Sequence, residues 1–233
     1  MVRVKICGVT STTEAQFAER HGAHAIGVLV GRVHVAPDFV EPAVANLISR
    51  SLPPFIAAVL VTHLDEPDAL MRLADAVSFP VLQLHSDLNA STFRELRARL
   101  SPRKIISKVS VEGEAAVERA REIEQFVDAI VLDTRDRATD RVGGTGMVHD
   151  WSISARIAST SKVPIILAGG LTPENVAQAI RAVKPWGVDV NSGVETSDGR
   201  KDEVAYNASS RPHRRSSNIH GHDAAPRNKR VFP

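Results

Sequence analysis

The chain has 233 residues, of which 43% are hydrophobic and only 4% aromatic, so Val, Ile, Leu and Ala must fill most of its core. Its single cysteine excludes an internal disulfide, and no apolar run approaches the roughly 20 residues of a membrane-spanning helix. Most of the excess positive charge lies in residues 206–233, and the rest of the chain has no basic stripe of the kind that binds nucleic acid.

Short apolar runs alternate with helical patterns along the chain, which is the order of a parallel sheet built from βαβ units. We expect strands at residues 2–7, 25–30, 55–61, 81–84, 104–109, 128–132, 163–167 and 187–190. We expect helices at residues 12–21, 41–50, 66–76, 90–100, 114–124, 151–159 and 173–183, with Pro173 suited to a first helical position. Such units in this number close an α/β fold of the (β/α)8 TIM-barrel type, and a doubly wound open sheet is the alternative.

The pattern weakens near the end of the chain. Residues 203–205 begin an amphipathic segment, but residues 207–217 are rich in Ser, Arg, His, Pro and Asn and have no apolar stripe. We therefore expect a barrel domain over 1–202, with a degenerate or missing final helix, and a disordered basic tail over 203–233. The chain starts with a strand pattern and no secretory signal, so we expect a cytoplasmic protein without nucleic-acid or membrane partners.

Two strand ends carry side chains that can move protons. Cys7 closes the first apolar run and Asp133 closes the sixth. The carboxyl ends of all strands meet on one rim of a barrel, so a thiol and a carboxyl group there are a candidate base and acid. A lone cysteine is also often a buried apolar residue, and its position alone leaves both interpretations open.

Two glycine-containing turns follow neighbouring strands. Gly169 and Gly170 precede a predicted helix start, and Ser192 and Gly193 follow the last strand. Glycines let backbone amides approach an anion, and a helix N-terminus adds free N–H groups. Barrel phosphate sites are typically built by the loops after strands 7 and 8, so these turns predict a phosphorylated ligand. Two ordinary turns that need glycine are the alternative.

A third glycine cluster, which includes Gly144, lies at residues 143–146. It follows Asp133 within a polar loop that is long for a connection between a strand and a helix. Either a lid or a plain surface loop would account for this composition.

Taken in order, these stretches resemble the phosphoribosylanthranilate isomerase family of tryptophan biosynthesis. The match is carried by residues 5–8, 83–85, 132–134, 143–146, 150–151, 168–171, 173–176 and 188–195, and it spans residues 1–202. The resemblance implies a (β/α)8 barrel without cofactor or metal. It also implies an Amadori rearrangement that converts N-(5-phosphoribosyl)anthranilate to 1-(o-carboxyphenylamino)-1-deoxyribulose 5-phosphate.

The resemblance implies roles for individual side chains. Asp133 would protonate the ring oxygen so that the furanose opens, and Cys7 would remove the C2 proton of the resulting Schiff base. A thiol with a pKa near ~8.5 needs a modest decrease for that task, and Lys5 on the same strand face could supply it or be structural. Burial would keep Asp133 protonated. His85 is either a polar core residue or a contact on the rim.

One loop departs from the family pattern. The family commonly carries a Pro-x-Ser-x-Arg motif after the second strand, and its arginine holds the anthranilate carboxylate. Residues 31–39 lack this motif, so Arg32 or His34 could take that place, or both could be solvated. The alternatives are therefore an isomerase for another amine substituent and an idle phosphosugar-binding protein, the latter disfavoured by the acid–base pair. A monomer and a homodimer both fit.

Overall fold

The computed structural model describes residues 1–31, 37–134, 149–196 and 201. The predictions for Arg32, His34 and Gly144 fall outside these residues, and so do those of a degenerate final helix and of a disordered tail over 203–233. The strands and helices expected in residues 1–190 all have counterparts in the described part.

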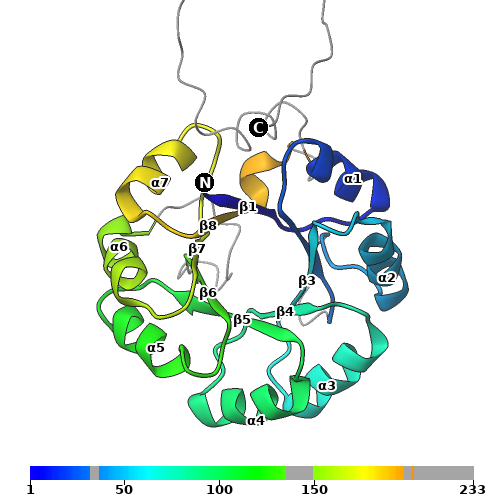
Figure 1. Ribbon diagram of the computed structural model, residues 1–233, viewed down its shortest axis with the longest axis horizontal. Helices are drawn as coiled ribbons and strands as arrows, with labels where there is room; N and C mark the ends of the chain where they lie inside the picture. Colours follow the sequence, from blue (N-terminus) through cyan, green and yellow to red (C-terminus); the bar gives the residue numbers. More distant parts are fainter. Residues whose placement is uncertain (32–36, 135–148, 197–200, 202–233) are drawn as a thin grey trace, which may run out of the picture.

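Eight parallel strands pair in chain order, and the last pairs with the first, so the sheet closes into a barrel (Figure 1). The strands are β1 (Arg3–Ile6), β2 (Ala25–Leu29), β3 (Ala57–Thr62), β4 (Val81–Leu84), β5 (Lys104–Ser110), β6 (Ala129–Asp133), β7 (Ile165–Leu167) and β8 (Gly187–Val190). The closed order confirms the (β/α)8 prediction and excludes the open doubly wound sheet.

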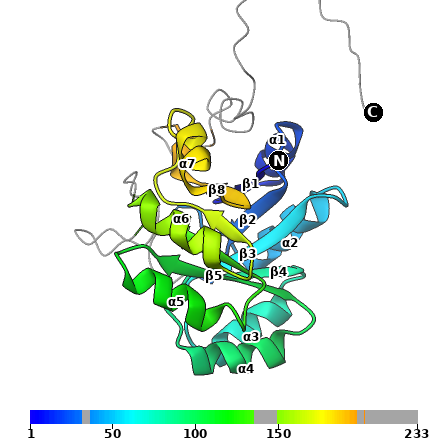
Figure 2. The ribbon, with the colours of Figure 1, turned by 60° about the vertical axis from the view of Figure 1, so that its left-hand side comes forward.

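Helices cover the outside of the barrel (Figure 1). They are α1 (Thr12–Arg20), α2 (Pro42–Ser51), α3 (Pro67–Ala76), α4 (Ala90–Leu100), α5 (Ala115–Ile123), α6 (Trp151–Thr160) and α7 (Val176–Val183). Figure 2 shows α5, α6 and α7 following one another along one flank. A short 3-10 helix, η1 (Ser192–Val194), follows β8.

Strand residues alternate between two apolar layers. In β6, Ile130 and Leu132 pack outward against the helices, whereas Ala129 and Val131 belong to a separate cluster inside the barrel. This alternation arises because successive side chains of a strand point to opposite faces. The inner cluster consists of Cys7, Leu29, Val59, Val61, Ile106, Ala129, Val131, Ile166 and Ala168. A side chain that ends an inner row therefore points into the barrel at its rim.

Element boundaries differ from the prediction by at most three residues, and β3 and α7 show why. Strand β3 begins at Ala57 opposite Ala25, and Phe55, predicted to lie in the strand, is 98% exposed. Helix α7 begins at Val176, so Pro173 does not occupy its first position. The reason is a turn in which the Asn175 side chain accepts a hydrogen bond from the Thr172 amide and donates one to the Gly170 carbonyl. This turn holds the segment before Val176 outside the helix.

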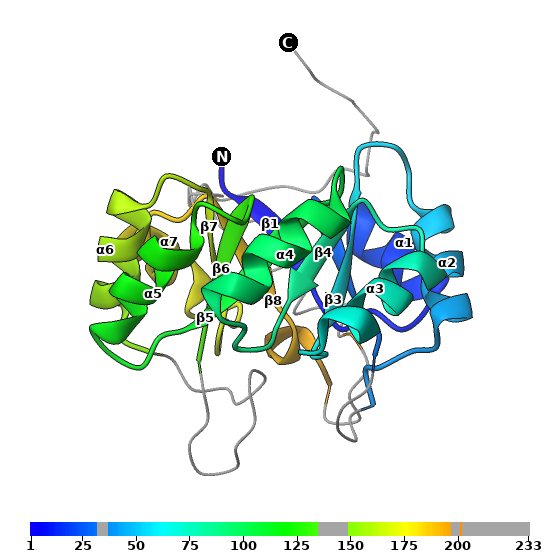
Figure 3. The same ribbon diagram turned by 90° about the horizontal axis from the view of Figure 1, so that it is seen from below.

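All strands run in one direction, so their carboxyl ends form a single rim. Helix η1 lies at this end of the barrel in Figure 3, and the N-terminus lies at the other end. The predicted functional side chains that the structure describes all belong to strands or to loops at the rim.

Candidate active site

Cys7 directly follows β1 and points into the barrel. Its amide donates to the Val190 carbonyl of β8 at 2.9 Å, and the residue is only 7% exposed. Lys5 precedes it by two residues and shares its face, as the strand alternation predicts. The thiol is thus held at the seam where the last strand meets the first.

A buried ion pair lies beneath the thiol. The Lys5 Nζ atom is 2.6 Å from Asp189 Oδ2, and these two residues are register partners in β1 and β8. Asp189 Oδ1 has no hydrogen-bond partner within the part of the chain that the structure describes. Sequence analysis did not identify Asp189, although an acidic residue inside an apolar strand was the available signal.

Gly27 in β2 makes room for both side chains. A Cβ atom at this position would lie 2.8 Å from Cys7 Sγ and 2.9 Å from Lys5 Nζ. Real Cβ atoms do not approach other heavy atoms this closely, so any larger residue would displace the thiol or the ammonium. Gly27 was also missed in the sequence, because a glycine inside a strand carries several meanings.

The surroundings of Cys7 do not supply the lowered pKa that a base at neutral pH needs. Burial is the largest influence and raises the pKa of the thiol, while the positive charge of Lys5 lowers it and the negative charge of Asp189 raises it again. The outcome is a pKa of about 11, not a modest decrease. Because burial, with the negative charge of Asp189, outweighs the positive charge of Lys5, the thiol holds its proton at neutral pH.

Asp133 ends β6, where the inner row of Ala129 and Val131 places its side chain inside the barrel. His85 Nε2 lies 3.4 Å from its Oδ2 atom, and the Thr134 amide donates to its Oδ1 atom at 2.7 Å. Each oxygen of the Asp133 carboxylate therefore has its own partner, one after β4 and one after β6. Among the described residues, this carboxylate lies on the rim with β7 and β8 between it and Cys7.

The surroundings of Asp133 favour its ionised form. Burial raises the pKa of this carboxyl, but hydrogen bonding and positive charge from His85, the Thr134 amide and the charge of Lys108 together lower it below its usual value. Lys108 is a buried β5 residue whose ammonium also meets Asp87 at 3.2 Å. The ligand-free site thus holds an ionised Asp133.

His85 is both buried and in contact with Asp133. Its Nδ1 atom lies 3.2 Å from Gln83 Nε2, and its ring stacks on that of His63 at 4.8 Å between centroids. His63 in turn meets the ring of Phe39 edge-on at 5.5 Å. These rings form a row from the loop after β2 to the carboxylate, so the two sequence-based alternatives for His85 are not exclusive.

The two glycine turns contact one another and the strand of Asp133. Gly169 and Gly170 have φ angles of +77° and +65°, a region that glycine adopts without strain. A Cβ on Gly169 would clash with Thr134 and reach Asp133 Oδ1 at 3.0 Å. A Cβ on Gly193 would overlap the Leu171 carbonyl, so the turn after β8 packs directly on the turn after β7.

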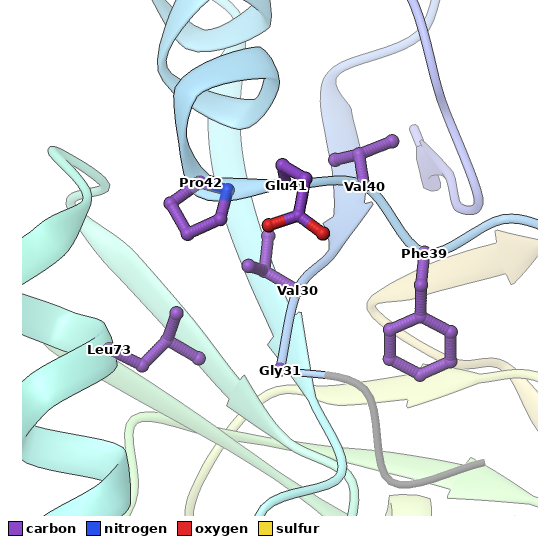
Figure 4. Close-up of a pocket in the computed structure, with 7 residues that line it drawn as sticks. All are labelled: Val30, Gly31, Phe39, Val40, Glu41, Pro42 and Leu73. Atoms are coloured by element: carbon purple, nitrogen blue, oxygen red, sulfur yellow. The ribbon is translucent and has the colours of Figure 1, made fainter.

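A separate cavity of about 260 Å³ lies outside the barrel wall (Figure 4). It is lined by Val30, Gly31, Phe39, Val40, Glu41, Pro42 and Leu73, and neither Cys7 nor Asp133 is among these residues. Figure 4 shows the Phe39 ring directed away from Pro42 and Leu73. The cavity is therefore distinct from the acid–base pair.

The described part of the chain has neither a cluster of metal ligands nor a membrane-spanning helix. No group of three or more His, Cys, Asp or Glu side chains could hold a metal ion there. No helix there is long and apolar enough to cross a membrane.

The arrangement is similar to that of known proteins. A family model described as N-(5′-phosphoribosyl)anthranilate (PRA) isomerase matches residues 4–206. A Methanosarcina mazei protein named N-(5′-phosphoribosyl)anthranilate isomerase 2 is 45% identical over 203 residues, covering 87% of this chain and 90% of its own length. The crystal structure of phosphoribosyl anthranilate isomerase from Thermotoga maritima is 33% identical with a TM-score of 0.78, covering 91% of this chain and 98% of its own.

Another solved structure of a phosphoribosyl anthranilate isomerase contains a ligand. It is a complex with reduced 1-(o-carboxyphenylamino)-1-deoxyribulose 5-phosphate, with a TM-score of 0.76 and 33% identity over 91% of this chain and 98% of its own.

Proposed function

The chain belongs to the N-(5′-phosphoribosyl)anthranilate isomerase family and is an isomerase of tryptophan biosynthesis, and we propose that Cys7 and Asp133 are the base and acid of its Amadori rearrangement. The reaction converts N-(5′-phosphoribosyl)anthranilate to 1-(o-carboxyphenylamino)-1-deoxyribulose 5-phosphate. It moves hydrogens within one molecule and needs no electron acceptor, which fits an enzyme without a cofactor.

The observation that carries the assignment is the order of elements on the rim. Going round the barrel, β6 with Asp133 is followed by β7, β8 and then β1 with Cys7. The glycine turns after β7 and β8 therefore lie between the acid and the base. A pentose whose 5-phosphate binds to these turns has its ring within reach of both side chains.

The proposed phosphate site consists of Gly169, Gly170, Ser192 and Gly193. The backbone of the two turns is free to adopt positive φ or a close approach because Gly169, Gly170 and Gly193 lack Cβ atoms. Their amides, together with the first turns of η1 and α7, offer N–H groups to an anion. A phosphate bound there anchors the part of the substrate that does not react.

The chemical steps follow from the positions of the two groups. Protonated Asp133 donates its proton to the ring oxygen as the C1–O bond breaks, which leaves a Schiff base between C1 and the anthranilate nitrogen. The Cys7 thiolate then removes the proton from C2. The C2–H electron pair forms the C1–C2 double bond of an enolamine, and the C1–N π pair returns to the nitrogen of the protonated Schiff base. Loss of the proton from the C2 hydroxyl and gain of a proton at C1 then convert the enolamine to the ketone.

At neutral pH, Cys7 and Asp133 together carry one proton. The ligand-free site holds it on Cys7, whose pKa is about 11, and leaves Asp133 ionised. The productive form has the same number of protons but carries this one on Asp133. The reaction therefore proceeds through a minor protonation state of the two groups, which substrate binding must favour.

The anthranilate carboxylate needs a cation. We assign this role to Arg32 or His34, in the loop after β2 that lacks the usual family motif. We assign Gly144, in the loop that follows Asp133, to substrate binding as well. Lys5 supports Cys7 by its charge, and His85 holds Asp133 in position. The remaining assignments are a barrel domain over 1–202, a basic tail over 203–233, and a cytoplasmic monomer or homodimer without nucleic-acid or membrane partners.

A coupled fluorescence assay with phosphoribosylanthranilate tests the acid–base roles. The wild type should turn over, and Cys7→Ala and Asp133→Asn should each lose about 100-fold to 10,000-fold in kcat, the range for loss of a general acid or base. Leu29→Met, a change elsewhere in the inner layer, serves as the control. Full rates in both variants would refute the assigned roles, and binding of the phosphosugar without turnover by the wild type would indicate an idle binding protein.

A further inference from the structure

Lys201 is a buried cation at the rim that no step above uses. Its side chain is only 2% exposed, and its Nζ atom lies 2.6 Å from both Glu195 Oε1 and Asn191 Oδ1 and 3.4 Å from the Asn191 carbonyl oxygen. Lys201 also forms an antiparallel bridge with Glu195. The ammonium is thus engaged on three acceptors, and two of them belong to the residue that directly follows β8.

Asn191 connects this cation to the turn that carries Cys7. Its Nδ2 atom donates to Asp38 Oδ2 at 3.2 Å, which links the loop after β8 to the loop after β2. Its side-chain oxygen lies directly against Gly8, which has a φ of +70° and no space for a Cβ atom. Since the Cys7 amide binds the Val190 carbonyl next door, Asn191 forms the wall against which the Cys7–Gly8 turn rests.

Resting on the proposed role of Cys7, we propose that Lys201 is a positioning residue for this base. By fixing the Asn191 side chain against Gly8 it sets the turn from which the thiol projects, and its ammonium places positive charge on this side of the site. The proposal gives a function to a residue that lies 194 positions from Cys7 in the chain.

The charges around the thiol agree with this role. Burial raises the pKa of Cys7, and Lys201 is one of two cations that lower it, the other being Lys5. Lys5 is balanced by its ion pair with Asp189, which raises the pKa of the thiol. Lys201 shares its charge with Glu195, and Asp38 lies behind the Asn191 amide. Glu14 of α1 adds a carboxylate, which accepts hydrogen bonds from Thr10, three residues after Cys7.

The test measures the ionisation of Cys7 without using the enzyme reaction. The chain contains one cysteine, so protein labelled with 13C at the cysteine Cβ gives a single resonance that reports thiol and thiolate. Titration of the full chain is compared for wild type, Lys201→Met, Lys201→Arg and Asn191→Ala. Lys162→Met is the control, because it removes one positive charge from a side chain that is 86% exposed.

Lys201→Met should raise the pKa of Cys7 by about 0.5 or more and lower kcat about tenfold with little change in KM, because it removes both the charge and the clamp. Lys201→Arg should restore most of both values. Asn191→Ala should lower kcat while leaving the pKa closer to that of wild type. Lys162→Met should change neither.

The proposal is overturned if Lys201→Met titrates like wild type and keeps its kcat within twofold. It is also overturned if kcat falls only in step with the melting temperature while the pKa of Cys7 stays unchanged, which would mark Lys201 as merely structural. Should Lys201→Met not fold, Lys201→Gln gives the same readouts with the hydrogen bonds partly retained. An inactive wild type whose Cys7 still responds to Lys201 would contradict the proposed function and not this electrostatic coupling.

Discussion

Cys7 and Asp133 are almost equally buried, yet burial decides the pKa of only one of them. On the base side, Lys5 is neutralised by Asp189, so burial prevails and the thiol keeps its proton. On the acid side, His85, Lys108 and the Thr134 amide all favour the carboxylate, and together they outweigh burial. For two groups at equal depth, the neighbouring charges and hydrogen bonds thus decide whether burial prevails.

The two sides also differ in how they are built. The base side is assembled across the closure of the barrel, from β1, β2 and β8 and from Lys201 beyond them. The acid side is assembled from consecutive strands, β4, β5 and β6. A substitution on either side should therefore shift the titration of its own group and leave the other group nearly unchanged.

The largest expected effect comes from Asp189→Asn. This substitution removes the anion beside Cys7, so that the remaining neighbouring charges favour the ionised group, as they do at Asp133. The buried Lys5 ammonium loses its carboxylate partner, so the free energy of unfolding should fall by about 3–5 kcal/mol. The pKa of Cys7 should fall too, because Asp189 is one of the causes that raise it. Urea unfolding and the 13C titration of the cysteine measure the two effects.

Asp68→Asn is the matched control for this prediction. Asp68 also pairs with a cation, Arg99, but its side chain is 77% exposed, so its loss should cost less than about 1 kcal/mol. Equal destabilisation by the two substitutions would contradict a structural role for the Lys5–Asp189 pair.

A smaller effect is expected for His85→Gln on the acid side. Removal of His85 takes away the hydrogen bond and the charge that lower the pKa of Asp133, so this pKa should rise. The acid limb of kcat/KM should then move to higher pH, and kcat should fall about tenfold because the carboxyl is less well oriented. A pH profile of kcat/KM measures both changes.

His21→Gln controls for the loss of an imidazole. His21 follows α1, where its ring contacts the Phe17 carbonyl, and α1 leads from the rim to the opposite end of the barrel. If His85→Gln left the acid limb where the wild type and His21→Gln have it, His85 would not be the partner that sets the pKa of Asp133.

The smallest effect is expected for pH itself. The pKa of Cys7 is about 11, so the thiol holds its proton below this pH. The pKa of Asp133 lies below the usual value of 3.8, so this carboxyl is ionised above pH 3.8. Between these limits the pair carries one proton, and the fraction with that proton on Asp133 does not depend on pH. The wild-type kcat/KM should therefore change by less than about twofold from pH 6 to pH 9. A rise through neutral pH would instead indicate a thiol with a lowered pKa.

The barrel and the rim positions were predictable because they depend on local patterns. Alternating apolar residues and helix spacing placed β1 and β6 correctly, and the architecture then put Cys7 and Asp133 on one rim. The start of α7 was mispredicted because Asn175 folds the segment before it into a turn. Helix-start signals such as Pro173 do not reveal such side-chain competition.

The protonation states were not predictable from the sequence. Lys5 lies two residues from Cys7, and its charge alone suggests a lowered pKa. Its partner Asp189 lies 184 positions away and meets it only because the last strand closes on the first. His85 and Asp133 likewise meet only in the folded barrel. Pairings of this kind depend on strand order and register, which local residue patterns do not encode.

The central claim is that Cys7 and Asp133 face the same carbons of a pentose anchored by the turns after β7 and β8. A crystal structure of this chain with reduced 1-(o-carboxyphenylamino)-1-deoxyribulose 5-phosphate tests it most directly. We expect the phosphate to contact Gly170 and Gly193. We expect Cys7 Sγ to lie beside C2, and the Asp133 carboxyl to lie beside the oxygen released from the ring. A ligand bound in the cavity beside Phe39 and Leu73, or one that contacts only one of the two groups, would contradict it.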